Sequence, residues 1–142
     1  MRLLLLLIAV LAVGIIIARL RSRAALSSAS ENARPTVGSA EADAQTLRAL
    51  RDAGADLTKA TEVNFYLYFP TREAAERAAA SAGTPVLTAS VGPGALGSNW
   101  LCYVTGTIVP SESTIRAAST RLAALAASLD GEYDGWEAAV AK

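Results

Sequence analysis

Residues 63–70 read Val-Asn-Phe-Tyr-Leu-Tyr-Phe-Pro, and this stretch decides the fold. Large apolar side chains occupy every second position from its first residue, with Asn64, Tyr66 and Tyr68 between them. A period of two places alternate side chains on opposite faces of an extended chain, which predicts a β-strand with one buried face. Pro70 has no backbone N–H to donate and ends the strand. The side chains expected to face the core are Val63, Phe65, Leu67 and Phe69.

Helix and strand patterns alternate on both sides of this strand. Three segments carry Leu, Ile or Ala at helical spacing, and each is followed by a glycine that can end a helix. The expected elements are a helix over 41–53, the strand over 63–69, a helix opened by Thr71 and stopped by Gly83, strands over 85–91 and 100–109, a helix opened by Ser111 or Ser113 and stopped by Gly131, and a strand over 132–136. This β-α-β-β-α-β order after an additional N-terminal helix predicts an α+β domain of the ferredoxin-like, split βαβ class.

In this topology the helices cover one face of the sheet, and Tyr66 and Tyr68 lie on the other. Alternate residues of the neighbouring strand lie beside them: Leu101, Tyr103 and Thr105. Aromatic side chains on an open sheet face are how some modules stack RNA bases. Alternatively, the helix over 41–53 or the C-terminal tail packs over these tyrosines. The scarcity of accompanying basic residues favours this packing.

Charge is distributed unevenly along the chain, although the net charge is zero. Residues 1–40 carry five arginines and one glutamate, a net charge of +4, whereas residues 41–142 carry eight basic and twelve acidic residues, a net charge of −4. Binding to nucleic acid depends on Lys and Arg side chains that replace counterions on the phosphates. The acidic part therefore makes direct nucleic-acid binding unlikely and suits a basic protein partner.

Catalytic and cofactor motifs are not found in the chain. It has no histidine and one cysteine, Cys102, which falls in the middle of an expected strand and is best explained as a buried thiol. Glycines over 92–97 match a dinucleotide-binding pattern, but the stretch leads into a strand instead of the helix which that chemistry requires. The sequence predicts a protein that is not an enzyme and has no cofactor or metal.

The C-terminal stretch Asp130–Glu137 combines four carboxylates with Tyr133 and Trp136. One interpretation is structural: a turn at Asp134-Gly135, with Trp136 closing the core. The other is an acidic and aromatic edge that binds an arginine-rich protein segment through charge-assisted hydrogen bonds and cation–π contacts. Both can hold together. The candidate partner-binding residues are Glu132, Tyr133, Asp134, Glu137, Tyr66 and Tyr68.

The N-terminus is strongly apolar, with an uninterrupted run from Leu3 to Ala18 between Arg2 and Arg19. This length is at the short end for a membrane-spanning helix. A cleaved signal peptide is the alternative, but the arginines that follow the run favour an uncleaved anchor with the following chain in the cytoplasm. We expect a transmembrane anchor over 1–20, a flexible linker over 21–40 and a folded domain over 41–142.

Several blocks occur in the same order in a known family. They are Gly54-Ala55-Asp56-Leu57, Phe65-Tyr66-Leu67-Tyr68-Phe69-Pro70, Trp100-Leu101-Cys102, Pro110 and Gly131-Glu132-Tyr133-Asp134-Gly135-Trp136. In these blocks the chain resembles the RraB family, regulators of ribonuclease E activity. The resemblance implies a small acidic ferredoxin-like protein that binds ribonuclease E and inhibits it by protein–protein contact, without a cofactor.

This chain departs from the family pattern in its N-terminal anchor, its weaker acidity and its glycine-rich loop over 92–99. The anchor implies a single-pass protein of the bacterial cytoplasmic (inner) membrane, with its domain facing the cytoplasm. The alternative function is an RNA-binding or adaptor module with an unrelated role at the membrane.

Overall fold

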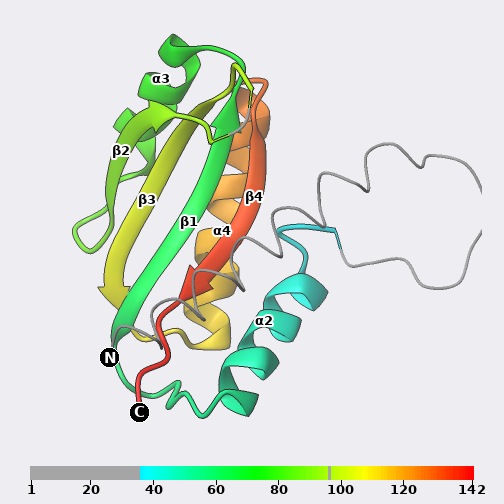
Figure 1. The fold of residues 1–142 in the computed structure, drawn as a ribbon, viewed down its shortest axis with the longest axis vertical. Helices are drawn as coiled ribbons and strands as arrows, with labels where there is room; N and C mark the ends of the chain where they lie inside the picture. The colour runs from blue at the N-terminus through cyan, green and yellow to red at the C-terminus, as the bar shows by residue number, and fades with distance from the viewer. Residues whose placement is uncertain (1–35, 96) are drawn as a thin grey trace, which may run out of the picture. The chain divides into compact units, whose positions relative to one another are not determined.

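The computed structural model describes residues 36–95 and 97–142. This part is an α+β domain with three helices and one four-stranded antiparallel sheet (Figure 1). The elements are α2 (Ala40–Asp52), β1 (Thr61–Phe69), α3 (Arg72–Ala82), β2 (Thr88–Pro93), β3 (Trp100–Ile108), α4 (Glu112–Ser128) and β4 (Glu132–Ala138).

The strands lie in the order β2-β3-β1-β4, and every neighbouring pair is antiparallel. Helix α3 connects β1 to β2, and β3 lies between those two strands. Helix α4 connects β3 to β4, and β1 lies between them. The chain order and the strand order therefore agree with the split βαβ arrangement expected from the sequence.

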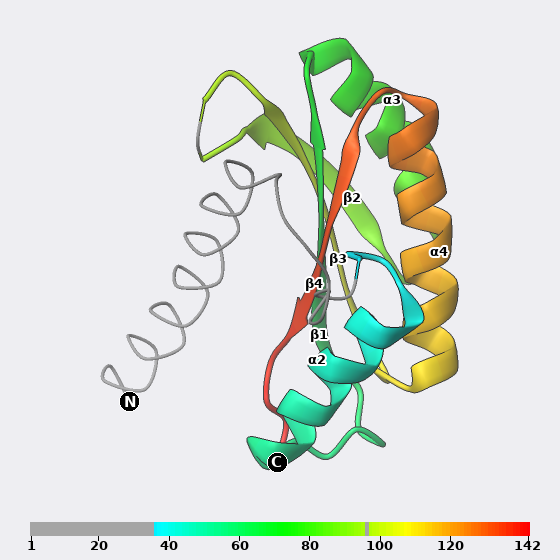
Figure 2. The ribbon, with the colours of Figure 1, turned by 90° about the vertical axis from the view of Figure 1, so that its right-hand side faces the viewer.

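Helices α3 and α4 cover the same face of the sheet (Figure 2). The four apolar side chains of β1 that alternate along the strand are at most 1% exposed, as predicted. They pack with residues of β3 and with apolar positions of both helices: Cys102, Val104, Ala75, Ala78, Ala82, Ile115, Leu122 and Ala126. Alanines on α3 allow that helix to lie close to the sheet, because a methyl group adds little thickness between them.

Side-chain caps fix where the helices begin. The hydroxyls of Ser39, Thr71 and Ser111 accept hydrogen bonds from the backbone N–H of the third residue of α2, α3 and α4, respectively. After α2, Gly54 has φ +88°, and the Ala55 N–H reaches back to the carbonyl of Leu50, a Schellman arrangement. The predicted caps at Thr71 and Gly54 are confirmed, and Ser111 is the cap of α4.

Helix α4 ends before Gly131, as expected, but the residue in the left-handed region is Asp130, with a φ of 56°. Gly131 is required for a different reason: a Cβ built there would lie 2.8 Å from the carbonyl oxygen of Tyr68 and would collide with the ring of Phe69. The glycine therefore allows the end of α4 to pass against the end of β1.

Strand β2 begins later than the predicted 85–91. A tight turn occupies the preceding residues, in which the Thr84 N–H donates to the Leu87 carbonyl at 2.9 Å and the Thr84 hydroxyl accepts from the Leu87 N–H. This turn directs Leu87 into the core, where it is 5% exposed. The residues after it then pair with β3, so the strand extends to Pro93.

The interpretation in which the N-terminal helix covers Tyr66 and Tyr68 is wrong. Helix α2 packs against α4, and its buried residues Asp43, Leu47 and Leu50 point into that contact. Within residues 36–95 and 97–142, no helix is packed on the sheet face that carries the two tyrosines.

The expected anchor over 1–20 and most of the expected linker lie outside the described residues. In the part of the chain that the structure does describe, no helix combines the length and the apolar character needed to cross a bilayer. The last positions of the linker contact the domain: Val37 packs against the core, and Gly38 lies beside the ring of Tyr133.

Candidate functional site

A bulge in β4 decides which of its side chains reach the surface. Phe65 pairs with Trp136 and Leu67 pairs with Tyr133, so Tyr66 lies opposite two residues of β4. In a regular strand, residues three apart point to opposite faces. The additional residue shifts the alternation by one, and both aromatic side chains of β4 therefore point to the face covered by α4.

The two residues in the bulge are Asp134 and Gly135, and Gly135 has φ +99°. The predicted turn at this dipeptide is wrong, because the strand continues through it to Ala138. The prediction that Trp136 belongs to the core is confirmed, since it is 9% exposed. Tyr133 is 6% exposed, so the structure removes it from the surface on which the sequence interpretation placed it.

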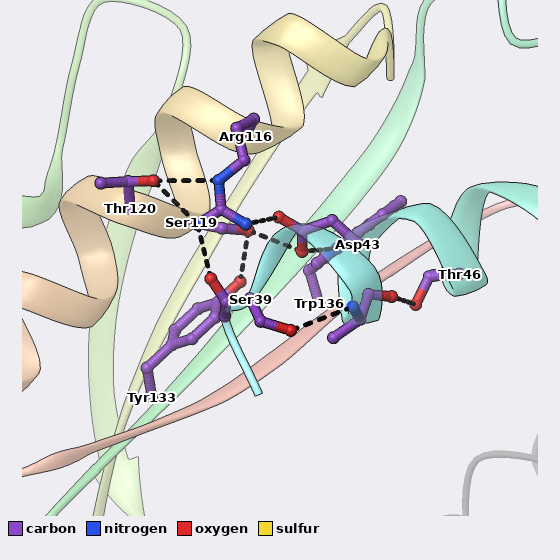
Figure 3. Close-up of polar contacts among 10 residues, drawn as sticks. Ser39, Asp43, Thr46, Arg116, Ser119, Thr120, Tyr133 and Trp136 are labelled. Carbon is purple, nitrogen blue, oxygen red and sulfur yellow. Dashed lines mark hydrogen bonds and ion pairs between the residues drawn. The ribbon is translucent and has the colours of Figure 1, made fainter. Parts of the chain in front are cut away.

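Asp43 of α2 is the centre of a buried polar network beneath this strand (Figure 3). Its Oδ1 accepts from the indole Nε1 of Trp136 at 3.0 Å and from the hydroxyl of Ser119 at 3.1 Å. Its Oδ2 accepts from Arg116 Nη1 at 2.7 Å. The network joins α2, α4 and β4 through one carboxylate that is 3% exposed.

The direction of the hydrogen bond between Ser119 and Tyr133 follows from this arrangement. Their hydroxyl oxygens are 3.0 Å apart. An ionised carboxylate only accepts, so Ser119 uses its single proton on Asp43, and Tyr133 must donate to Ser119. Every buried polar side-chain atom of the described residues has a partner, which identifies the network as a structural connection between elements.

Arg116 closes the network at its edge. Its guanidinium also donates to the hydroxyl of Thr120 and to the carbonyl of Gly38, where the chain enters the domain. The sequence interpretation did not include Asp43, Arg116 or Ser119. The sequence does indicate that Asp43 is buried, because its spacing places it on the same helical face as Leu47 and Leu50.

The opposite face of the sheet presents a row of aromatic side chains. Tyr66 of β1 lies opposite Tyr103 of β3, with ring centroids 5.5 Å apart and an angle of 56° between the ring planes. Tyr68 lies on the same face of β1, opposite Leu101. The predicted neighbours of the tyrosines are thus confirmed, and all three tyrosines are half-buried.

Carboxylates border these tyrosines. Glu137 Oε1 accepts from the Tyr66 hydroxyl at 2.5 Å, and Glu132 is the pairing partner of Tyr68. The charge of Asp134 acts on Tyr68. On β1 itself, Glu62 lies two residues before Asn64 and accepts from its amide at 3.4 Å. Of the six predicted partner-binding residues, this face therefore brings together five: Tyr66, Tyr68, Glu132, Asp134 and Glu137.

The four strands contain no lysine or arginine at any position. Their charged residues are all acidic: Glu62, Glu132, Asp134 and Glu137. We call this surface, formed by these four carboxylates with Tyr66, Tyr68 and Tyr103, the acidic tyrosine face.

The environment of the acidic tyrosine face disfavours the ionised form of its tyrosines. Burial, together with the hydrogen bond to Glu137, raises the pKa of Tyr66 well above its ordinary value of 10.0. Burial and the charge of Asp134 also raise the pKa of Tyr68. Both hydroxyls are therefore neutral hydrogen-bond donors over the physiological pH range, and the negative charge of the face resides on its carboxylates.

The single cysteine is buried in β3, as predicted. Cys102 is fully inaccessible, and burial raises the pKa of its thiol from 9.0 to about 11. A neutral thiol is a poor nucleophile and a poor metal ligand. Among residues 36–95 and 97–142, no group of three or more His, Cys, Asp or Glu side chains is placed to hold a metal ion.

The chain matches a known protein family. The sequence model of the family described as RraB, regulator of ribonuclease activity B, matches residues 40–138, from the start of α2 to the end of β4. A comparison with curated proteins gives no match. The family match covers most of the chain and includes every element of the described domain, and the chain therefore belongs to the RraB family of regulators of ribonuclease activity.

Proposed function

We propose that this chain is a membrane-tethered regulatory protein that binds ribonuclease E, or another arginine-rich protein, and so modulates RNA degradation. Membership of a family described as regulators of ribonuclease activity supports regulation through a protein partner. The domain performs no chemistry of its own in this proposal, since its thiol is buried and its buried hydroxyls and carboxylate serve to connect helices to the sheet.

The partner binds the acidic tyrosine face. One observation carries this assignment: the sheet strands have four carboxylates and no cationic residue, and five of the predicted partner-binding residues meet on one face. Charge of one sign on a surface accelerates and strengthens association with a partner of opposite charge. Tyrosine is enriched at binding surfaces because its ring gives a large contact area and its hydroxyl gives a hydrogen bond.

The tether is the apolar run Leu3–Ala18, and the soluble domain faces the cytoplasm of a bacterium. The arginines at 19, 21 and 23 support this orientation, because positive charge after an apolar segment is retained on the cytoplasmic side. A cytoplasmic domain held at the inner membrane is compatible with binding to a membrane-bound RNA-degrading assembly. The tether is tested by fractionation: the intact chain should stay in membranes after a high-salt wash, and a mature N-terminus beyond about residue 25 would contradict it.

A second candidate, direct binding of single-stranded RNA, is favoured only by the paired rings of Tyr66 and Tyr103. Bases stack on such rings. The four carboxylates on the same face oppose it, because they repel the phosphate backbone.

The test of the proposed function is affinity purification of the intact, tagged chain from membranes of the bacterium that makes it. We expect ribonuclease E to be recovered at low salt and lost at high salt, because screening weakens contacts between exposed charges. Recovery of the chain with neither that ribonuclease nor another arginine-rich protein, under conditions in which the ribonuclease is present and intact, would contradict the proposal.

A further inference from the structure

We propose that the acidic tyrosine face selects arginine over lysine, and that Tyr103, which is absent from the sequence-predicted site, pairs with Tyr66 to produce this selectivity. The inference rests on the proposed function, because it names the side chain by which a cationic partner is recognised on that same face. It goes further by requiring a chemical preference that charge attraction alone does not produce.

The first argument is the geometry of the rings. Tyr66 and Tyr103 lie side by side on the two central strands, at 5.5 Å between centroids and tilted by 56°. Both tyrosine side chains are half-buried, so each is held in place by the sheet and is still partly accessible. A planar guanidinium can stack on such a ring, whereas an ammonium is a compact, strongly hydrated charge that gains less from the contact.

The second argument is the placement of Glu137 beside those rings. The Tyr66 hydroxyl donates a hydrogen bond to Glu137 Oε1 at 2.5 Å and so holds the carboxylate at the edge of the aromatic pair. A carboxylate has several lone-pair sites and accepts further donors while it keeps this bond. An arginine stacked on the pair can therefore also donate an N–H to Glu137, which combines ring contact with a charge-assisted hydrogen bond.

The molecule already contains this combination elsewhere. Arg72 of α3 places its guanidinium carbon 5.5 Å from the centroid of the Trp100 ring. At the same time its Nε donates to Glu76 Oε1 at 2.7 Å. A guanidinium that lies over an aromatic ring and pairs with a nearby carboxylate is thus an arrangement that this chain makes within itself, and the acidic tyrosine face offers the same two groups to a partner.

The third argument is the chemistry of the surrounding positions. On the side of β3 and β2, the residues around Tyr103 that face the same way are uncharged: Leu101, Thr105, Ser90 and Thr88. Thr105 is already engaged with Asn64, to which its hydroxyl donates at 2.6 Å. The carboxylates lie on β1 and β4. A cation is therefore attracted to the β1–β4 side, where Tyr66 and Tyr68 lie beside the carboxylates and the ring of Tyr103 lies against that of Tyr66.

The experiment uses the full-length chain in a non-ionic detergent and two synthetic peptides of equal length and charge. In one peptide arginine alternates with serine, and in the other lysine replaces every arginine. We expect the arginine peptide to bind on the order of three- to tenfold more tightly, the range that cation–π contacts with one or two rings produce. Calorimetry at fixed low salt measures both affinities.

Two variants test the roles of the residues. Tyr103→Leu should reduce the preference to below about twofold while retaining charge-driven binding of both peptides, and Tyr103→Phe, which keeps the ring, should preserve the preference. Glu137→Gln should weaken the arginine peptide more than the lysine peptide. Circular dichroism of each variant confirms that it is folded.

The outcomes separate this inference from the proposed function. Equal affinity of the wild-type chain for both peptides would overturn the selectivity while leaving a cationic partner in place. An unchanged preference in folded Tyr103→Leu would overturn the role of that ring. Failure to bind either peptide, or tighter binding of single-stranded RNA than of the arginine peptide, would overturn the assignment of a cationic protein partner to this face.

Discussion

The indole Nε1 of Trp136 donates to Asp43 Oδ1 at 3.0 Å, although the two residues are 93 positions apart in the sequence. This bond connects the first described helix to the last strand. The bond lies on the face of β4 opposite the carboxylates assigned to partner binding. The buried network therefore fixes β4 from its core face, while the carboxylates lie on its other face.

Replacing Asp43 with alanine should lower the free energy of unfolding by about 2–4 kcal/mol, because it leaves the Trp136 indole and the Ser119 hydroxyl without their acceptor. The expected loss does not exceed about 4 kcal/mol because the Arg116 side chain is 32% exposed, and water can hydrate its guanidinium once the carboxylate is gone. Urea unfolding of the intact chain, followed by tryptophan fluorescence, measures the change.

The matched control is Asp52→Ala at the other end of α2, where the side chain is exposed. It should change the free energy of unfolding by less than about 0.5 kcal/mol. Equal effects of the two substitutions would show that the buried network contributes nothing particular to stability.

Gly131→Ala should destabilise the domain by more than about 2 kcal/mol, because the added methyl group meets the Phe69 ring and lies 2.8 Å from the Tyr68 carbonyl oxygen. Gly92→Ala is the comparison, since a Cβ there meets nothing within 4 Å. Thermal unfolding of both variants checks the contrast, and a Gly131→Ala chain as stable as Gly92→Ala would contradict the close packing.

The order of elements could be predicted from the sequence because it depends on local patterns. Alternation along β1 and the caps at Thr71 and Gly54 involve residues only a few positions apart. The start of β2 could not be predicted, because a threonine-capped turn shifts it. That turn competes with strand pairing in a way that composition does not reveal.

The sequence predicted the acidic residues of the candidate site, but it did not predict which side chains of β4 are buried. Tyr133 and Trp136 are three residues apart, and strict alternation would place one of them on each face. Gly135, in the left-handed region, permits the bulge that buries both. Asp43 resembled an ordinary acidic residue in the first turn of a helix, and only its long-range partners reveal its role.

The domain should lose stability at alkaline pH through Cys102. Burial raises the pKa of this thiol from 9.0 to about 11, so the unfolded chain releases the proton more readily than the folded chain does. The free energy of unfolding is therefore unaffected by the thiol below about pH 9. As the pH rises from about 9 towards about 11, the thiol lowers this free energy by about 2 kcal/mol.

Urea unfolding of the wild-type chain and of Cys102→Ala over this pH range isolates the effect. The tyrosines titrate in both proteins, so only the difference between the two curves reports on the thiol. The wild-type free energy of unfolding should fall more steeply than that of Cys102→Ala. Parallel curves would contradict a raised pKa for the buried thiol.

The most direct test of the account is the affinity of the full-length chain for an arginine-rich segment of its proposed partner, ribonuclease E, after charge reversal on the acidic tyrosine face. Glu132→Lys combined with Asp134→Lys should weaken binding by roughly tenfold or more at low salt. The control combines Asp52→Lys with Glu73→Lys, two exposed positions on helices α2 and α3 that make the same change in net charge. We expect the control to retain most of the affinity, and equal affinity of the two folded double variants would contradict the assignment of the binding surface.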